Sequence, residues 1–176
     1  LGGVTQFSYD TNGKLLRQTN PLGQTTRYEY DTQGNLVKAI DPAGAVTTWT
    51  YDEAHQPLTV TDALGQQVRF RYDAQHRLVS HTDPLQQVTT YTYNDAGQVQ
   101  THTRAGGGVT RYDYTAGLLT QLTLPAGNRY QLSYDEAGRV VSLRDPDGQT
   151  TTLTYDAANR VTALTNPLGH SLQLGY

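Results

Sequence analysis

The side chains of this 176-residue chain that could do metal or acid–base chemistry are its five histidines and its many aspartates. Two histidines, His81 and His102, occupy equivalent places in successive repeats, 21 residues apart. If one β-strand lies between them, they stand roughly 10 Å apart, because neighbouring strands are about 4.8 Å apart. Zinc bonds to nitrogen are about 2.0–2.1 Å long, so these two histidines cannot share one ion. The histidines therefore predict no metal site.

The recurring aspartates could suggest calcium, but calcium takes six to eight oxygen ligands and each repeat offers one carboxylate at this place. Turn capping is the better interpretation. The serines lack a nucleophile elbow, and Gly106-Gly107-Gly108 leads into no helix, so it is not a phosphate loop. A column of aromatic residues could stack sugars or bases, although packing across strands explains it better. We predict no catalytic, cofactor-binding or metal-binding residue, no enzymatic activity and no cofactor.

These residues lie at fixed distances from a tyrosine that recurs every 21 residues along the chain, with one interval of 20. The series is Tyr9, Tyr30, Tyr51, Tyr72, Tyr93, Tyr114, Tyr134, Tyr155 and Tyr176. Such a fixed period is typical of a repeat architecture, in which one unit cannot bury its own apolar face. The positions two before each tyrosine are all large and apolar or aromatic, while their neighbours are polar apart from Gly175. This alternation predicts half-buried β-strands and no helix.

A turn signature follows each tyrosine. Aspartate stands directly after it at Asp10, Asp31, Asp52, Asp73, Asp135 and Asp156, and glycine ends the loop at Gly13, Gly34, Gly97 and Gly138. Glycine adopts the left-handed conformation without cost. His55, His76 and Asn159 replace it, and these types tolerate positive φ better than most. A second turn, Asp-Pro-x-Gly, falls between tyrosines, as at 41–44. We therefore divide each repeat into strands of seven, a loop of four and a turn of three residues.

The register predicts which residues share a face. Tyr30, Tyr28 and Thr26 should share one face with Val37 and Ala39, and the same holds for Leu58, Val60, Val141 and Leu143 in other repeats. Leu36 and Ile40 should lie on the opposite face, with Arg27, Glu29 and Lys38. The shortened loop at Thr115-Ala116-Gly117 should account for the 20-residue step, because a deletion within a strand would turn every later side chain over.

Composition sets further bounds. Cysteine is absent, which excludes disulfides, and no apolar run approaches the roughly 20 residues needed to span a membrane. A net charge of −3 without a basic block argues against a nucleic-acid partner. Leu1-Gly2 aligns with Leu22-Gly23, the chain closes on Tyr176, and it contains no methionine. We therefore expect residues 1–176 to be one array of about eight 21-residue repeats, cut from a longer one.

The pattern Tyr-Asp-x-x-Gly-x-Leu followed by Asp-Pro-x-Gly resembles the Rhs (rearrangement hotspot), or YD, repeat over essentially the whole chain. The fullest matches are Tyr9 to Leu15 and Tyr30 to Leu36. Local departures are Pro57 in place of leucine, Gln86 in place of the turn glycine, and Arg104-Ala105-Gly106-Gly107 in place of Asp-Pro-x-Gly. The resemblance implies an all-β fold, an antiparallel meander of hairpins that forms a curved single-layer sheet within a spiral β-shell.

By the same resemblance, the expected function is that of a wall segment in a hollow shell. Such shells enclose a C-terminal toxin in bacterial polymorphic toxins and insecticidal toxin complexes, and the teneurins carry a related one. The expected partners are the remaining repeats and the enclosed toxin domain, besides edge-to-edge self-association of the segment. The expected location is secreted or cell-surface, reached by a bacterial secretion system. The alternative function is a cell-surface adhesion or glycan-binding module.

Overall fold

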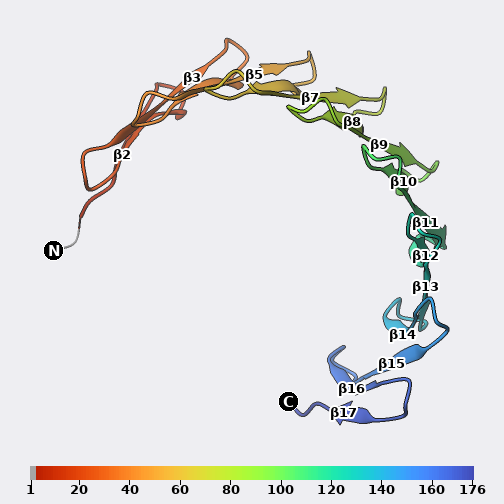
Figure 1. The fold of residues 1–176 in the computed structure, drawn as a ribbon. Coiled ribbons are helices and arrows are strands. Elements are labelled where there is room, and N and C mark those ends of the chain that lie inside the picture. Colours follow the sequence, from red (N-terminus) through yellow and green to blue (C-terminus); the bar gives the residue numbers. More distant parts are fainter. Residues whose placement is uncertain (1–2) are drawn as a thin grey trace. The chain divides into compact units, whose positions relative to one another are not determined.

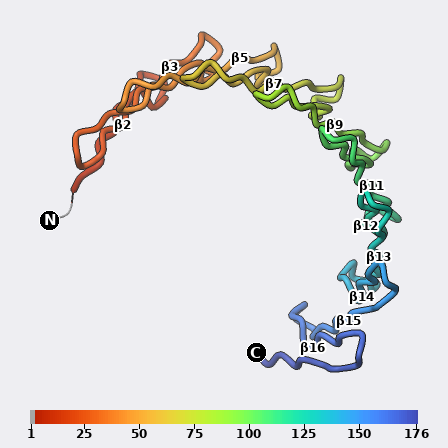
Figure 2. Tube along the Cα trace, viewed as in Figure 1, coloured from red at the N-terminus to blue at the C-terminus, as the bar shows by residue number. Residues whose placement is uncertain are grey.

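A computed structural model describes residues 3–176, and Leu1 and Gly2, predicted to lie in a turn, fall outside this range. The described chain contains 17 β-strands and no helix (Figure 1). It divides into two units, Leu1–Thr89 and Thr90–Tyr176, with the boundary inside one strand. Within each unit, every strand pairs antiparallel with the next strand along the chain, as the trace in Figure 2 allows the reader to follow. The predicted all-β antiparallel meander is therefore confirmed.

The first unit holds eight strands and the start of a ninth: β1 (Gln6–Tyr9), β2 (Leu15–Thr19), β3 (Thr25–Tyr30), β4 (Leu36–Ile40), β5 (Val46–Tyr51), β6 (Pro57–Thr61), β7 (Gln67–Tyr72), β8 (Leu78–Thr82) and β9 (Val88–Tyr93). The second unit continues with β10 (Val99–Thr103), β11 (Val109–Thr115), β12 (Leu118–Thr123), β13 (Arg129–Tyr134), β14 (Val140–Arg144), β15 (Thr150–Tyr155), β16 (Val161–Thr165) and β17 (Ser171–Gln173). Each signature tyrosine from Tyr9 to Tyr155 therefore lies in an odd-numbered strand, at or next to its end.

The two kinds of turn have one geometry, which corrects the predicted division into a four-residue loop and a three-residue turn. In the loop after Tyr30, the Asp31 N–H donates to the Asn35 carbonyl at 3.0 Å, and the Gly34 N–H donates to the Asp31 carbonyl at 3.1 Å. The proline turn at 41–45 repeats both bonds, at 2.9 and 3.0 Å. Both connections are thus five residues long, with the fourth residue left-handed: φ is 93° at Gly34 and 86° at Gly44.

The left-handed positions were placed correctly by the sequence pattern. His55, His76 and Asn159 have φ values of 63°, 61° and 63°, and Gln86, which replaces a turn glycine, has 62°. The shortened loop is a two-residue turn in which Ala116 and Gly117 both have positive φ, at 50° and 81°. Later strands keep their faces, since Tyr112 pairs with Leu122 across this turn and Leu122 pairs with Tyr130 on the next strand. The prediction that the missing residue lies in the loop is confirmed.

A β-bulge lies next to each signature tyrosine from Tyr9 to Tyr155, and it was not predicted. Glu29 pairs with Lys38, but Tyr30 pairs with Leu36, so Val37 is an extra residue on β4. Directly opposed residues share a face, and the predicted placement of Leu36 on the face opposite Tyr30 is therefore wrong. A bulge inserts one unpaired residue and shifts the register beyond it. The assignment of the paired residues is confirmed, because Ala39 pairs with Tyr28 and Ile40 with Arg27. The faces of Val37, Leu58 and Val141 stay predictions, since these bulge residues have no cross-strand partner in the ladders.

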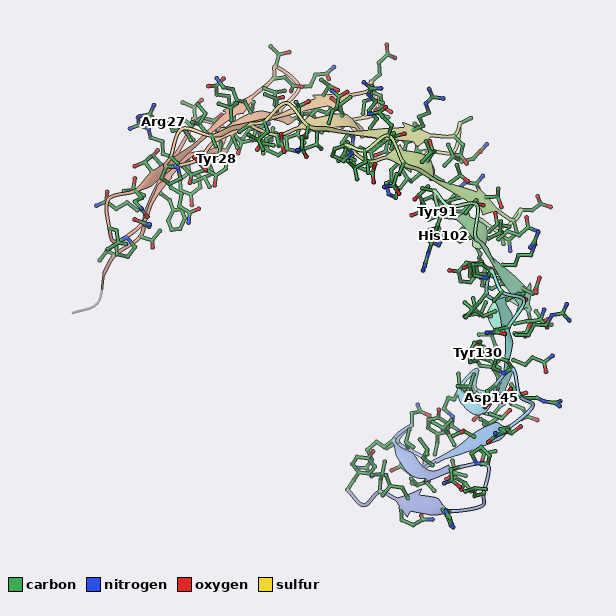
Figure 3. The ribbon with its side chains drawn as sticks, viewed as in Figure 1. Arg27, Tyr28, Tyr91, His102, Tyr130 and Asp145 are labelled. Atoms are coloured by element: carbon green, nitrogen blue, oxygen red, sulfur yellow. The ribbon has the colours of Figure 1, made fainter. Side chains whose placement is uncertain are left out.

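The sheet is one layer without a closed core. Among the described residues, only Ala163 and Thr110 are buried, at 8% and 4% exposure. The large side chains at the centre of the tyrosine face are half-buried, as in Tyr28 and Trp49, whereas Glu29 and Thr50 beside them are exposed. Figure 3 shows Arg27 and Tyr28 pointing to opposite sides of the ribbon. The tyrosine face is therefore the better packed one, except in the terminal strands β1 and β17. The prediction that Phe7 is half-buried is wrong, because Phe7 is 51% exposed, and Leu172 is 61% exposed.

Candidate functional site

The signature tyrosine joins each repeat to the one before it. The Tyr30 hydroxyl donates to the carbonyl of Leu15 at 3.0 Å, and Leu15 is the residue that pairs with Tyr9. The ladder between β2 and β3 covers Arg17–Thr19 and Thr25–Arg27. The tyrosine bond joins the same two strands just beyond this ladder, and we call it the tyrosine seam. The same bond recurs 15 residues back from Tyr51, Tyr72, Tyr114, Tyr134 and Tyr155, at 2.7–3.0 Å.

Three of the tyrosine hydroxyls that make this bond have a raised pKa. Burial raises the pKa of Tyr51 and Tyr72, and the nearby carboxylates of Asp31 and Asp52 add to this effect. Burial also raises the pKa of Tyr114. Since a tyrosine ordinarily ionises near pH 10, a raised pKa keeps the hydroxyls of Tyr51, Tyr72 and Tyr114 protonated, and able to donate, at neutral pH.

The aspartate after the tyrosine closes its loop. One carboxylate oxygen of Asp31 accepts the N–H groups of Gln33 and Asn35, at 3.0 and 2.8 Å. Asn20 and Asn166 do the same in proline turns with an amide oxygen. The aspartates and asparagines are thus turn caps, in the way short polar side chains stabilise tight turns.

Three of these aspartates also form ion pairs with the arginine that ends their loop. The pairs are Arg77–Asp73, Arg139–Asp135 and Arg160–Asp156, each at 2.7 Å. The backbone N–H of that arginine, followed by its guanidinium, lowers the pKa of Asp73, Asp135 and Asp156 below the usual 3.8. In Asp31 the largest cause is the side-chain hydrogen bond from Asn35. These loops therefore favour the ionised carboxylate.

Successive loops after the tyrosine are tied by a side-chain hydrogen bond that we call the loop clasp. It joins the fifth residue of one loop to the fourth residue of the next. His55 donates from Nδ1 to Asn35 Oδ1 at 2.9 Å, and His76 donates in the same way to Gln56 Oε1 at 3.0 Å. Arg139 donates to Asn159 Oδ1 at 2.7 Å. The clasp partners are the three residues that replace a left-handed glycine in these loops, so each replacement is held by a neighbour.

The other three histidines lie outside the loop clasps. His102 on β10 stacks on Tyr91 of β9, with ring centroids 5.0 Å apart and planes 6° apart, and Figure 3 shows both side chains on one side of the ribbon. His81 pairs across the hairpin with Phe70. His170 lies in the turn before β17, where its N–H donates to Asn166. Over residues 3–176, no three His, Cys, Asp or Glu side chains gather at metal-binding distance.

The hollows on the sheet are open. One of them, of about 560 Å³, lies over β6, β7 and β8 and includes Arg69, Arg71 and Ser80 in its lining. None of its lining residues is a carboxylate or a histidine, so it holds no acid–base pair for catalysis. In the part of the chain that the structure describes, no helix is long and apolar enough to cross a membrane.

Comparison with known proteins agrees with this geometry. The sequence profile of the family described as RHS Repeat matches seven overlapping stretches, 9–46, 30–67, 51–87, 72–109, 93–129, 112–150 and 134–171. No curated protein sequence matches the chain.

Solved structures share the fold. The chain is similar to the crystal structure of TcdB2-TccC3-Cdc42, with 20% identity and a TM-score of 0.74 over 92% of this chain and 10% of that one. It is also similar to TcdB2-TccC3-TEV, with 19% identity and a TM-score of 0.75 over 93% and 10%. The Photorhabdus luminescens Tc holotoxin pore with the TccC3-D651A mutation gives 17% identity and 0.57 over 93% and 13%. The chain thus spans about a tenth of the length of these chains.

Proposed function

The chain belongs to the RHS repeat family, and we propose that it forms a stretch of wall in a hollow shell that encloses a C-terminal toxin for delivery to target cells. The observation that carries the proposal is the single-layer sheet, whose described residues include only two that are buried. A layer of this kind gains stability by continuing into further repeats, since each unit buries its face against its neighbours. The neighbours with this fold are about ten times longer, which leaves room for such repeats.

A wall of this construction would act as a container. Its strands would form a barrier between the enclosed chain and the solvent. The turn caps, the tyrosine seams and the other signature residues from Tyr9 to Asp156 would hold neighbouring strands of this barrier together. The crystal structures that share the fold are of Tc toxin complexes. By analogy we propose as partners the remaining repeats of the same shell and the enclosed toxin domain. We further propose that the whole protein is secreted or placed on the cell surface by a bacterial secretion system.

The container role can be tested by protease protection of the C-terminal tail in the full-length protein. A flexible Gly/Ser linker in place of residues 46–61 removes the β5–β6 hairpin and opens the wall, and the substitution Gly106→Ala serves as a conservative control. We expect the tail to be resistant in the native and control proteins and to be digested in the linker variant. The strands on either side should remain protease-resistant, which separates a gap from general unfolding.

A tail that is digested equally fast in all three proteins would exclude the container role. The remaining candidate would then be adhesion or glycan binding. It would use the half-buried aromatic side chains of the tyrosine face, such as Tyr28, Trp49 and Phe70, as a stacking surface.

A further inference from the structure

Strand β7 departs from the repeat in its charges. The positions three and one before the tyrosine carry Arg69 and Arg71, which lie on the face opposite Phe70. The equivalent positions of β3 and β11 carry one arginine and one acid, Arg27 with Glu29 and Arg111 with Asp113. Among the odd-numbered strands, β7 is therefore the one in which two cations share these places without an acid.

Among the residues that the structure describes, no acidic side chain forms an ion pair with either arginine. Glu29 of β3 pairs with Lys38 at 2.9 Å, but the cross-strand partner of Arg71 is Ser80. The Arg69 Nε donates to the neutral Gln67 side chain at 2.6 Å. The structure gives Arg71 no hydrogen bond or ion pair within residues 3–176, and both arginines are exposed. Two like charges on one strand face repel each other, and an anion between them would offset this repulsion.

Hydroxyl groups surround the two guanidinium groups. Thr59 on β6 and Thr82 on β8 are the cross-strand partners of Arg69, so they flank it on both sides. Ser80 stands opposite Arg71. These five side chains line the open hollow of about 560 Å³, and none of the residues that line it is acidic. The hollow therefore combines two positive charges with three neutral hydroxyls. The Thr59 hydroxyl also hydrogen-bonds to that of Thr50 at 2.7 Å, and it is free to donate to an ion when Thr50 is the donor of that bond.

We propose that this hollow binds a tetrahedral oxyanion, namely a phosphate or sulfate group. Residues two apart on a strand are separated by about 7 Å, so an ion between the two side chains can be reached by both guanidinium groups. Arginine presents a planar fork of donors that matches oxyanions, and each hydroxyl can donate one more bond. A tetrahedral group has enough oxygens to use these donors, whereas a carboxylate has two.

The test is a titration of the isotope-labelled chain, followed by the NMR signals of the arginine Nε–H groups and of the β6–β8 backbone amides. The probes are inorganic phosphate, inorganic sulfate and phenyl phosphate, with sodium chloride at equal ionic strength as the control. We expect saturable shifts at Arg69, Arg71 and Thr82 with the oxyanions and none that saturate with chloride. Equal binding of phenyl phosphate supports an ester as the natural source, and binding of the inorganic ions alone supports the free ion.

Substitutions identify the residues. Arg71→Gln should weaken binding about tenfold, the loss expected for one charge-assisted contact. Arg71→Lys keeps the charge but loses the fork, so its binding should fall between that of Arg71→Gln and the native chain. Arg111→Gln, at the place that corresponds to Arg69, is the matched control and should leave binding unchanged. Circular dichroism confirms that each variant is folded. Equal weakening by Arg71→Gln and Arg111→Gln, or saturable shifts with chloride, would overturn the proposal.

Discussion

At the scale of single residues, the two tyrosines of β3 have different roles although they stand two positions apart. Tyr30 donates to the Leu15 carbonyl at 3.0 Å, whereas the structure gives Tyr28 no hydrogen bond within residues 3–176. Tyr30→Phe should therefore lower the free energy of unfolding by about 0.5–1.5 kcal/mol, the usual net value of one hydrogen bond. Tyr28→Phe should change it by less than about 0.5 kcal/mol. Urea denaturation measures both, and equal effects would contradict the assignment of the seam bond.

The glycine run at 106–108 offers a comparison of two neighbouring residues. Gly107 has φ of 79°, whereas Gly106 is not left-handed, and an added Cβ meets no atom within 4 Å at either position. Gly107→Ala should destabilise the chain by about 1–2 kcal/mol through backbone strain alone. Gly106→Ala should stabilise it by about 0.4–1 kcal/mol, because it restricts the unfolded chain. Thermal and urea unfolding measure the difference, and the opposite order would disprove the turn geometry.

The ion-paired aspartates predict a dependence of stability on acid. The folded pKa of Asp73, Asp135 and Asp156 lies below 3.8, so their contribution is fully present above that pH and is lost as the pH falls through the folded value. Asparagine caps the same turn natively at Asn20 and Asn166. Replacing the three aspartates by asparagine should therefore keep the turns and flatten the stability profile in this acid range. The measurement is the urea midpoint of both proteins at several pH values in this acid range. If the ion pairs have no role, the midpoint will fall with decreasing pH equally steeply in the native and the substituted chain.

At the scale of strands and turns, the half-buried tyrosine face sets the cost of core substitutions. Trp49 pairs with Val60 across the hairpin. Its side chain is half-buried against its own sheet, and no second layer covers it within the described residues. Trp49→Ala in a closed core costs about 3–5 kcal/mol. On this open layer we expect less than about 3 kcal/mol, as measured by denaturant unfolding. A larger loss would indicate that a second layer covers Trp49.

Much of each element could be predicted from the sequence, because strands and turns leave local signals. The alternation of polar and apolar residues correctly predicted that Tyr28 and Ala39 share a face. Glycine, or the residues that replace it, correctly marked the positions with left-handed backbone. The bulge at Val37 could not be predicted, since it changes which residues are opposed and not the order of polar and apolar residues. The equal geometry of the two turns was also missed, because proline marks only one of them.

The contacts between repeats were missed for a different reason. The seam from Tyr30 to Leu15 and the clasp from Asn35 to His55 join residues 15 and 20 positions apart. The local sequence pattern does not show which residues so far apart are in contact, because this depends on which strands are neighbours in the sheet. The polar residue 20 positions before each glycine replacement, as Gln56 before His76, is no specific signal, because Lys14 also precedes Gly34 and Arg77 precedes Gly97 at this distance.

At the scale of the whole molecule, the terminal strands are its weakest places. All four residues of β1 and all three of β17 are exposed. An exposed edge can pair with another chain, so we expect the isolated segment to self-associate with rising concentration in sedimentation velocity. Phe7→Lys on β1 should reduce this association. Leu22→Lys, at a turn where leucine is 83% exposed, separates strand pairing from contacts between turns. A monomer at every concentration would contradict the expectation.

The ties between repeats have a mechanical consequence. Each tyrosine seam and each loop clasp reaches one repeat back, and each ladder joins strands that follow each other in the chain. Tension applied at a terminal strand therefore loads the bonds of that strand first and peels it away before the next strand bears any force. Each repeat released adds 21 residues, about 70 Å of extended chain. We therefore expect such a sheet to unfold sequentially from the pulled end, in steps of nearly equal length. Its resistance to a force applied at one end should be low.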